Sequence, residues 1–309
     1  MLGPFRRKPT LPPEIREVFA AALGHLETRV LKWKGVVAVC DRKGRNLEIN
    51  TAEHLQVLDN TPAKTPPIGL AIYLATRLGL PLPESLALDL KTVRPWFRSR
   101  VLHRRVLDGP SRGMCRRPAF ADPGAEAGPV DELITAVSIG GSRSTAFVTT
   151  RSLDEWGLSF EEVQMIGDEN LKALLSPDDL RDVDGAEGVL AVIDSTQETG
   201  ASACRVIDTL LPEIDPEIGV LFAVPADDTM LALPIRAGAG AKSLAALVQV
   251  TYAIAAERDE PLSEQVLWRR NGRVVRVPMT SVHEGGARRV HLEADGVVED
   301  LLRLLGELE

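Results

Sequence analysis

The spacing of apolar residues in the first third of the chain predicts short helices and strands separated by prolines. An amphipathic stretch follows the prolines at positions 12 and 13 and continues to about Trp33, with apolar residues at helical spacing. Two further runs flank a turn that contains Gly44, as in a hairpin. The elements expected here are a helix over 13–33, strands over Val36–Cys40 and Arg45–Asn50, and helices over Pro66–Leu78 and Pro95–Val106.

Hairpins alternate with helices in the rest of the chain. Asn271-Gly272 lies between two expected strands, and this dipeptide is the strongest short signal for a two-residue hairpin turn. Ser159 and Glu162 have the spacing of a capping box, which predicts the start of a helix. The expected strands are Leu133–Ile139, Thr145–Thr150, Val189–Ile193, Ile218–Val224, Met230–Ile235, Val266–Arg270 and Arg273–Val277, and the expected helices are 159–175, Ala201–Leu211, Lys242–Ala256 and Val297–Leu308.

This order of elements predicts the fold class and the domain organisation. Strict alternation of single strands and helices is absent, which favours an α+β protein with antiparallel or mixed sheets and helices packed on one face. Residues 108–129 contain Gly109-Pro110, Pro123-Gly124 and Gly128-Pro129, which break both helices and strands. We therefore expect an N-terminal α+β region over residues 1–128 and a C-terminal α+β domain over residues 129–309.

Three stretches of the second half carry a family resemblance. They are Leu153-Asp-Glu-Trp-Gly-Leu-Ser159 with the helix ending Asp168-Glu-Asn-Leu-Lys-Ala-Leu-Leu175, then Gly200-Ala-Ser-Ala-Cys-Arg-Val-Ile207, then Ala223-Val-Pro-Ala-Asp-Asp-Thr-Met-Leu-Ala-Leu233. In their order and spacing, the region from about residue 129 to 277 resembles the YtpQ family of uncharacterised bacterial cytoplasmic proteins. The resemblance implies a bacterial cytoplasmic protein. Because that family has no activity to carry over, it implies no functional residue.

The composition is that of a soluble globular protein. With 44% hydrophobic and 26% charged residues among 309, the chain can build sizeable cores. The longest uncharged stretch of the apolar segments, Ser243–Ala256, is shorter than the roughly 18–20 residues that cross a bilayer. Cys40, Cys115 and Cys204 are far apart in the sequence, which argues against a disulfide scaffold and indicates a reducing compartment. We therefore expect a cytoplasmic protein without membrane contact.

Charge is distributed unevenly along the chain. The whole chain carries −8, but residues 91–117, termed the basic segment, hold nine basic residues and one acid, so that the other 282 residues sum to −16. Arginine binds carboxylates and phosphates through two parallel hydrogen bonds and stacks on flat rings. Three interpretations stay open: ion pairs within the molecule, an acidic protein partner, and a nucleic-acid or phosphate ligand. The candidate partner-binding residues are Trp96, Arg98, Arg100, Arg104 and Arg105.

Other motifs that carry chemistry are sparse. The sequence contains no dinucleotide fingerprint, no phosphate-binding loop and no cysteine pair with zinc spacing, so no cofactor is expected. Asp194 follows an expected strand and Asp227-Asp228 occupy an expected hairpin turn, and three converging carboxylates could bind a divalent cation. Cys115 lies among basic residues, which would favour its reactive thiolate if the side chain is exposed.

Two functions compete on these observations. The first is a non-enzymatic binding or adaptor module that recognises an acidic protein partner through the basic segment. The alternative is a metal-dependent hydrolase or nuclease that uses Asp194, Asp227 and Asp228 on a phosphate-containing substrate. The positions of the aspartates, and the burial of the arginines, discriminate between the two.

Overall fold

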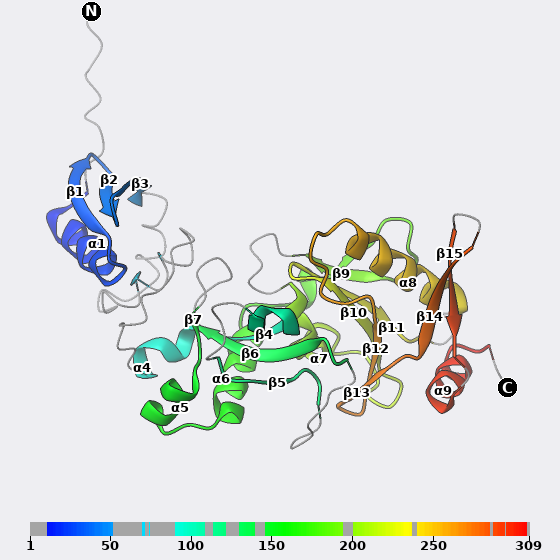
Figure 1. The fold of residues 1–309 in the computed structure, drawn as a ribbon. Helices are drawn as coiled ribbons and strands as arrows, with labels where there is room; N and C mark the ends of the chain where they lie inside the picture. Colours follow the sequence, from blue (N-terminus) through cyan, green and yellow to red (C-terminus); the bar gives the residue numbers. More distant parts are fainter. Residues whose placement is uncertain are drawn as a thin grey trace, which may run out of the picture. The chain divides into compact units, whose positions relative to one another are not determined.

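In the computed structural model, drawn as a ribbon in Figure 1, the chain forms two compact units. Unit 1 comprises Met1–Trp96 and Ile139–Ala146, and unit 2 comprises Phe97–Ser138 and Phe147–Glu309. The border expected after residue 128 falls outside the described residues and stays a prediction. The structure describes residues 11–51, 70–71, 74, 90–108, 114–121, 130–139, 146–193, 200–236, 240–284, 287–293 and 295–307.

Unit 1 contains a helix packed on a three-stranded antiparallel meander of order β1-β2-β3. Phe19 and Leu23 of the helix pack against Ala38, Cys40 and Ile49 of the strands. The elements are α1 (Pro13–His25), β1 (Arg29–Lys34), β2 (Val37–Arg42), β3 (Arg45–Asn50), α4 (Leu90–Val93) and the 3-10 turn η2 (Arg94–Trp96).

The helix expected over 13–33 is wrong in its second half. It ends at His25, Glu27 has a positive φ of 54°, and β1 follows as an edge strand paired with β2. Val30 and Trp33 of β1 both contact the core. The register of β1 against β2 shifts between Val30 and Lys32, and this irregularity puts the side chains of Val30 and Trp33 on the same face. This spacing of three residues resembles a helical repeat in the sequence, because a bulge changes the period of a strand locally.

The first sheet of unit 2 contains a strand where the sequence predicts a helix. Phe97–His103 forms β4, in which five of seven residues are buried. A strand covered on both sides has no alternation of polarity, so its sequence does not differ from that of a short buried helix. The sheet has the order β4-β6-β5 with β7 paired to β6, and its members are β4, β5 (Arg116–Pro118), β6 (Leu133–Ile139) and β7 (Ala146–Phe147).

Two helices follow this sheet, α5 (Thr150–Trp156) and α6 (Phe160–Lys172). The capping box expected at the start of α6 is confirmed: the backbone N–H of Glu162 donates to Ser159 Oγ, and Glu162 accepts from the Ser159 backbone N–H at 2.7 Å. The helix packs against β4, where Ser99 Oγ donates to the carbonyl of Gln164 at 3.0 Å. Gly167 lies where α6 comes very close to β4. A Cβ added to this glycine would lie only 2.7 Å from the backbone nitrogen of Ser99.

The second sheet of unit 2 has six strands, all paired antiparallel, in the order β13-β12-β10-β11-β9-β8. Its hairpin at Asn271-Gly272 is confirmed, and both residues have a positive φ, as the tight turn requires. The strands are β8 (Arg181–Asp182), β9 (Leu190–Ile193), β10 (Val220–Ala226), β11 (Thr229–Pro234), β12 (Val266–Arg270) and β13 (Arg273–Arg276), and the turn η5 (Pro177–Asp179) precedes β8.

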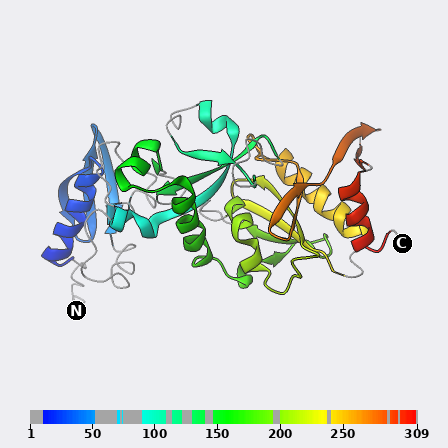
Figure 2. The ribbon, with the colours of Figure 1, turned by 90° about the horizontal axis from the view of Figure 1, so that it is seen from below.

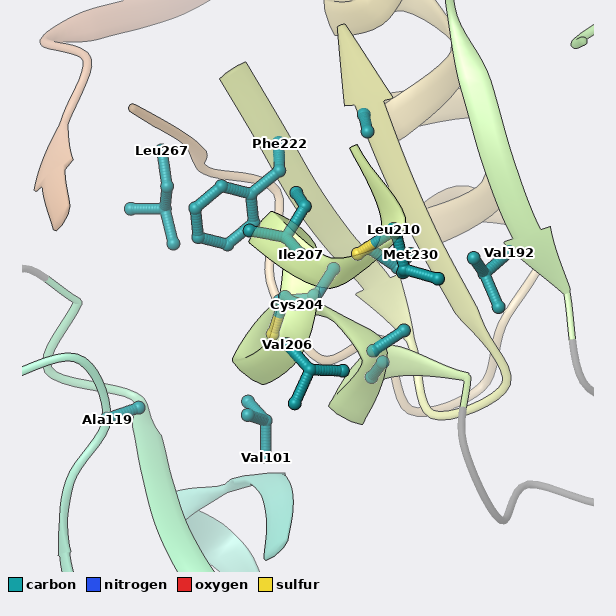
Figure 3. Packing of buried hydrophobic residues seen from close by; sticks show 14 of the residues in the cluster. Val101, Ala119, Val192, Cys204, Val206, Ile207, Leu210, Phe222, Met230 and Leu267 are labelled. Atoms are coloured by element: carbon teal, nitrogen blue, oxygen red, sulfur yellow. The ribbon is translucent and has the colours of Figure 1, made fainter. Parts of the chain in front are cut away.

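The central strands β10 and β11 of this sheet are buried on both faces. On one face, Cys204 and Ile207 pack against Phe222 and Met230 (Figure 3). On the other, Leu221 packs with apolar residues of two helices, one of which runs across β10 and β11 (Figures 1 and 2). The covering elements are η6 (Ala201–Val206) and α7 (Ile207–Leu210) on the first face, and α8 (Ala241–Ala256) and α9 (Gly296–Leu304) on the second.

The structure confirms the α+β class with mostly antiparallel sheets. Hairpins alternate with helices as expected, and the helical cover extends to both faces of the largest sheet. A separate two-stranded hairpin, β14 (Met279–Glu284) and β15 (Ala287–Leu292), precedes α9. Within the described ranges, no helix is long and apolar enough to cross a membrane.

Candidate functional site

The five candidate partner-binding residues lie in different environments. Trp96 is half-buried at the end of η2 in unit 1, whereas the arginines belong to unit 2. In β4, Arg98 is half-buried and donates from Nη1 to the Phe97 carbonyl at 2.7 Å, and Arg100 is only 6% exposed. Arg104 and Arg105 are exposed in the 3-10 turn η3 (Arg104–Asp108). The four arginines therefore do not form one exposed surface. Strand β4, which the sequence did not indicate, takes up Arg98 and Arg100, and only Arg104 and Arg105 are exposed.

Arg100 and Arg105 of the basic segment lie near acidic residues of the same unit. Arg105 donates from Nη2 to the Pro261 carbonyl at 2.6 Å, beside Glu260. Packing around its carboxyl group raises the pKa of Asp227, and the positive charges of Arg100 and Arg105 act against that rise. For Arg100 and Arg105 the structure thus favours interactions within the molecule.

Asp228 is held by an arginine. Arg258 Nη2 donates to its two carboxylate oxygens at 2.9 and 3.0 Å, and the Thr229 hydroxyl donates to Oδ1 at 2.8 Å. Asp227 is its neighbour in the β10–β11 turn, and the expected third ligand, Asp194, lies outside the described residues. Among the residues that are described, no group of three or more His, Cys, Asp or Glu side chains is placed to hold a metal ion. Nothing in this turn supports the metal-dependent alternative.

Three arginines are among the residues that line a pocket of about 560 Å³ in unit 2. Arg104 comes from η3, and Arg116 and Arg117 come from β5. We call this feature the basic pocket. Its other lining residues are Met114, Cys115, Pro118, Asp131, Leu133, Ile134, Thr150 and Phe160.

Backbone hydrogen bonds bring these residues together across the sequence. Arg116 and Arg117 pair with Ala136 and Thr135 of β6. The backbone N–H of Arg104 donates to the Glu132 carbonyl at 2.6 Å, which places η3 at the start of the same strand. The backbones of the three arginines are therefore positioned by β6, a strand in which every residue is buried, and by the turn before it.

The pocket is electropositive and accessible. Arg104 and Arg116 are exposed, and neither forms an ion pair within the described part of the chain. Arg117 Nη1 lies 3.1 Å from Glu161 Oε1, with 22% of the Arg117 side chain and 66% of the Glu161 side chain exposed. Among the described residues that line the pocket, Asp131 is the one acidic residue. Half-buried Phe160 and Pro118 add apolar surface beside the guanidinium groups.

The cysteines differ in their access to solvent. Cys115 is half-buried at the basic pocket, with Sγ 3.6 Å from the Thr150 hydroxyl. Cys40 and Cys204 are buried, and burial raises the pKa of their thiols to about 11 and about 12. Of the three thiols, Cys115 is the one that a reagent in solution reaches.

The sequence indicates the basic segment but not the pocket. Arg116 and Arg117 belong to the segment, yet their charge alone does not distinguish them from its other cations. Asp131, Thr150 and Phe160 lie beyond the segment, and no local signal links them to Arg104. Only the pairing of β5 with β6 reveals the arrangement.

Comparisons of the chain with protein-family models, with curated proteins and with solved structures find no match. The resemblance of residues 129–277 to the YtpQ family therefore stays a prediction.

Proposed function

We propose that this protein is a non-enzymatic binding module that recognises an acidic segment of a protein partner in the basic pocket. The observation that carries the proposal is that Arg104, Arg116 and Arg117, from two elements, line one pocket. A guanidinium group presents its donors in a flat fork that matches a carboxylate, so that three such groups together select a ligand with several carboxylates.

The size of the pocket favours a peptide over a nucleic acid. A volume of about 560 Å³ accommodates a few side chains and lies within the range of pockets that bind small ligands. A nucleic acid instead needs a stripe of cations that follows its backbone, and the net charge of −8 over the whole chain opposes a long polyanion.

The apolar part of the lining supports a protein ligand as well. Phe160 and Pro118 are half-buried and offer contact area to an aliphatic or aromatic side chain next to the acids. Interfaces of this kind combine aromatic and arginine contacts in one patch. Binding of this kind needs no reactive group, which agrees with the scarcity of catalytic motifs in the sequence.

A fluorescein-labelled hexaglutamate peptide tests the proposal by fluorescence anisotropy. We expect saturable binding to the full chain, weakened about tenfold or more by Arg104→Glu or Arg116→Glu because the pocket then repels the peptide. Arg181→Glu is the matched control: Arg181 is exposed on the edge strand β8, and its reversal makes the same change in net charge. Its affinity should stay within about twofold of the wild type.

Three outcomes would contradict the proposal. Equal weakening by all three variants would mean long-range attraction without a site. Tighter binding of a 20-nucleotide DNA strand, lost in Arg104→Glu, would assign the pocket to nucleic acid. A thermal shift with Mg²⁺ or Mn²⁺ that Asp228→Asn abolishes would favour the metal-dependent hydrolase or nuclease instead.

A further inference from the structure

Glu161 forms an ion pair with an arginine of the basic pocket. Its carboxylate extends from the first turn of α6 to Arg117 Nη1, which lines the pocket, at 3.1 Å. Glu161 itself is 66% exposed, so the pair is open to solvent. An exposed ion pair of this kind is weak and exchanges readily.

We infer that Arg117 is a carboxylate subsite that Glu161 occupies in the free protein, and that an acidic side chain of the partner replaces Glu161 on binding. The inference rests on the proposed function. It names Glu161 as an internal competitor that sets the affinity of the pocket, and it names the ligand group as a carboxylate.

The exchange at Arg117 fixes the kind of ligand. Replacing one carboxylate by another on the same guanidinium group yields little free energy, because one ion pair breaks as one forms. Net affinity must come from Arg104 and Arg116, which form no ion pair among the residues described. The ligand is therefore a segment with at least two neighbouring acidic residues, one for Arg117 and the others for these two arginines.

The backbone supports an exchange without unfolding of the helix. Glu162, and not Glu161, makes the capping box with Ser159, so release of Glu161 leaves the start of α6 intact. The backbone of Arg117 is held by strand pairing with Thr135, so the exchange leaves β5 in place. Only the rotamer of one exposed side chain has to change.

The test measures the hexaglutamate affinity of Glu161→Gln, which keeps the shape of the side chain and removes its charge. We expect binding about two- to fivefold tighter than that of the wild type, the range that corresponds to one exposed ion pair. Glu169→Gln is the matched control, because Glu169 lies on the same helix, pairs with Lys172 at 2.6 Å and is also exposed. Both variants change the net charge equally, yet Glu169→Gln should leave the affinity unchanged.

A double variant separates competition from a general charge effect. In an Arg117→Gln background, Glu161→Gln should lose its effect, because the subsite for which Glu161 competes is gone. Two outcomes would overturn the inference and leave the proposed function standing. In the first, hexaglutamate binds the wild type, but Glu161→Gln does not increase the affinity. In the second, the increase in affinity persists in the Arg117→Gln background. Failure of both the wild type and Glu161→Gln to bind hexaglutamate would overturn both.

Discussion

At the residue scale, burial separates the three thiols of the chain. Burial raises the pKa of Cys40 to about 11 and that of Cys204 to about 12, so at pH 8 their thiolate fractions are small and their sulfur atoms are also shielded. Cys115 is half-buried beside Arg116. We expect Ellman's reagent to modify one thiol rapidly in the native protein and three after denaturation.

The Cys115→Ser variant identifies the reactive thiol. It should abolish the fast phase and lower the denatured total to two, since the sequence has three cysteines. A fast phase that persists in this variant would mean that Cys40 or Cys204 reaches solvent. Slower modification of Cys115 in the presence of hexaglutamate would independently locate that peptide at the basic pocket.

The arginines show what a sequence reveals about single residues. Charge alone identifies the basic segment, because nine cations surround one acid. It does not reveal which of them face inward: Arg100 is 6% exposed and Arg104 is exposed, although they are only four positions apart. Arg100 lies inside β4, whereas Arg104 comes directly after its last residue, His103. Because a strand buried on both faces has no alternation of polar and apolar residues, the sequence does not show where it ends.

At the scale of elements, the capping box of α6 makes stability depend on pH. Hydrogen bonds from the backbone and hydroxyl of Ser159 hold the pKa of Glu162 below its usual value of 4.5. A carboxyl group whose pKa is lowered by folding stabilises the folded state above its unfolded pKa, and this contribution is lost as the pH falls through the folded value. The wild type should therefore exceed Glu162→Gln in melting temperature at pH 7.

This difference should shrink below about pH 4.5, where Glu162 takes up a proton and becomes neutral like glutamine. Thermal denaturation of both proteins between pH 3 and pH 7 measures the difference, and NMR titration of the Glu162 carboxyl carbon gives its pKa directly. A constant difference across this range would show that the charge of Glu162 contributes nothing to the cap.

The contact between α6 and β4 gives a second prediction at this scale. A Cβ at Gly167 would lie 2.7 Å from the backbone nitrogen of Ser99 and 3.2 Å from the carbonyl carbon of Arg98, so the helix must move away from the strand. We expect Gly167→Ala to destabilise unit 2 by about 1–2 kcal/mol, overpacking being partly offset by the better helix propensity of alanine. Urea denaturation measures the loss.

Gly296→Ala is the control for this substitution. Gly296 is exposed at the start of α9 in the same unit, and a Cβ there meets no atom within 4 Å. Its replacement should leave stability unchanged or raise it slightly. Equal effects of the two substitutions would mean that the close packing of α6 on β4 does not occur.

The elements also show which local signals survive folding. The capping box at Ser159 and the turn at Asn271-Gly272 are formed by neighbours in the sequence, and both were predictable. The strand β4 was not, because its partners β6 and α6 lie far along the chain and their cover removes its polar face. The basic pocket was hidden for the same reason, since it depends on the pairing of β5 with β6.

At the scale of the whole molecule, the apolar cores follow the division into units. One cluster, which contains Phe19 and Leu23, consists of residues of unit 1 alone. The two clusters on the faces of the six-stranded sheet consist of residues of unit 2 alone, and Leu221 and Phe222 of β10 belong to opposite faces. Because β10 is common to both of these clusters, they should unfold together, and separately from the first.

We therefore expect calorimetry of the full chain to resolve two thermal transitions. Two identical truncations assign them: Leu23 and Leu221 are each fully buried, and Leu→Ala in a core costs about 2–5 kcal/mol. Leu23→Ala should lower the midpoint of one transition by several degrees, and Leu221→Ala should lower the other, because each truncation opens a cavity in one core only. Were both midpoints to fall together in either variant, the units would unfold as one cooperative body. The basic pocket lies entirely in unit 2, so hexaglutamate binding should be lost at a lower temperature in Leu221→Ala than in the wild type, and at the wild-type temperature in Leu23→Ala.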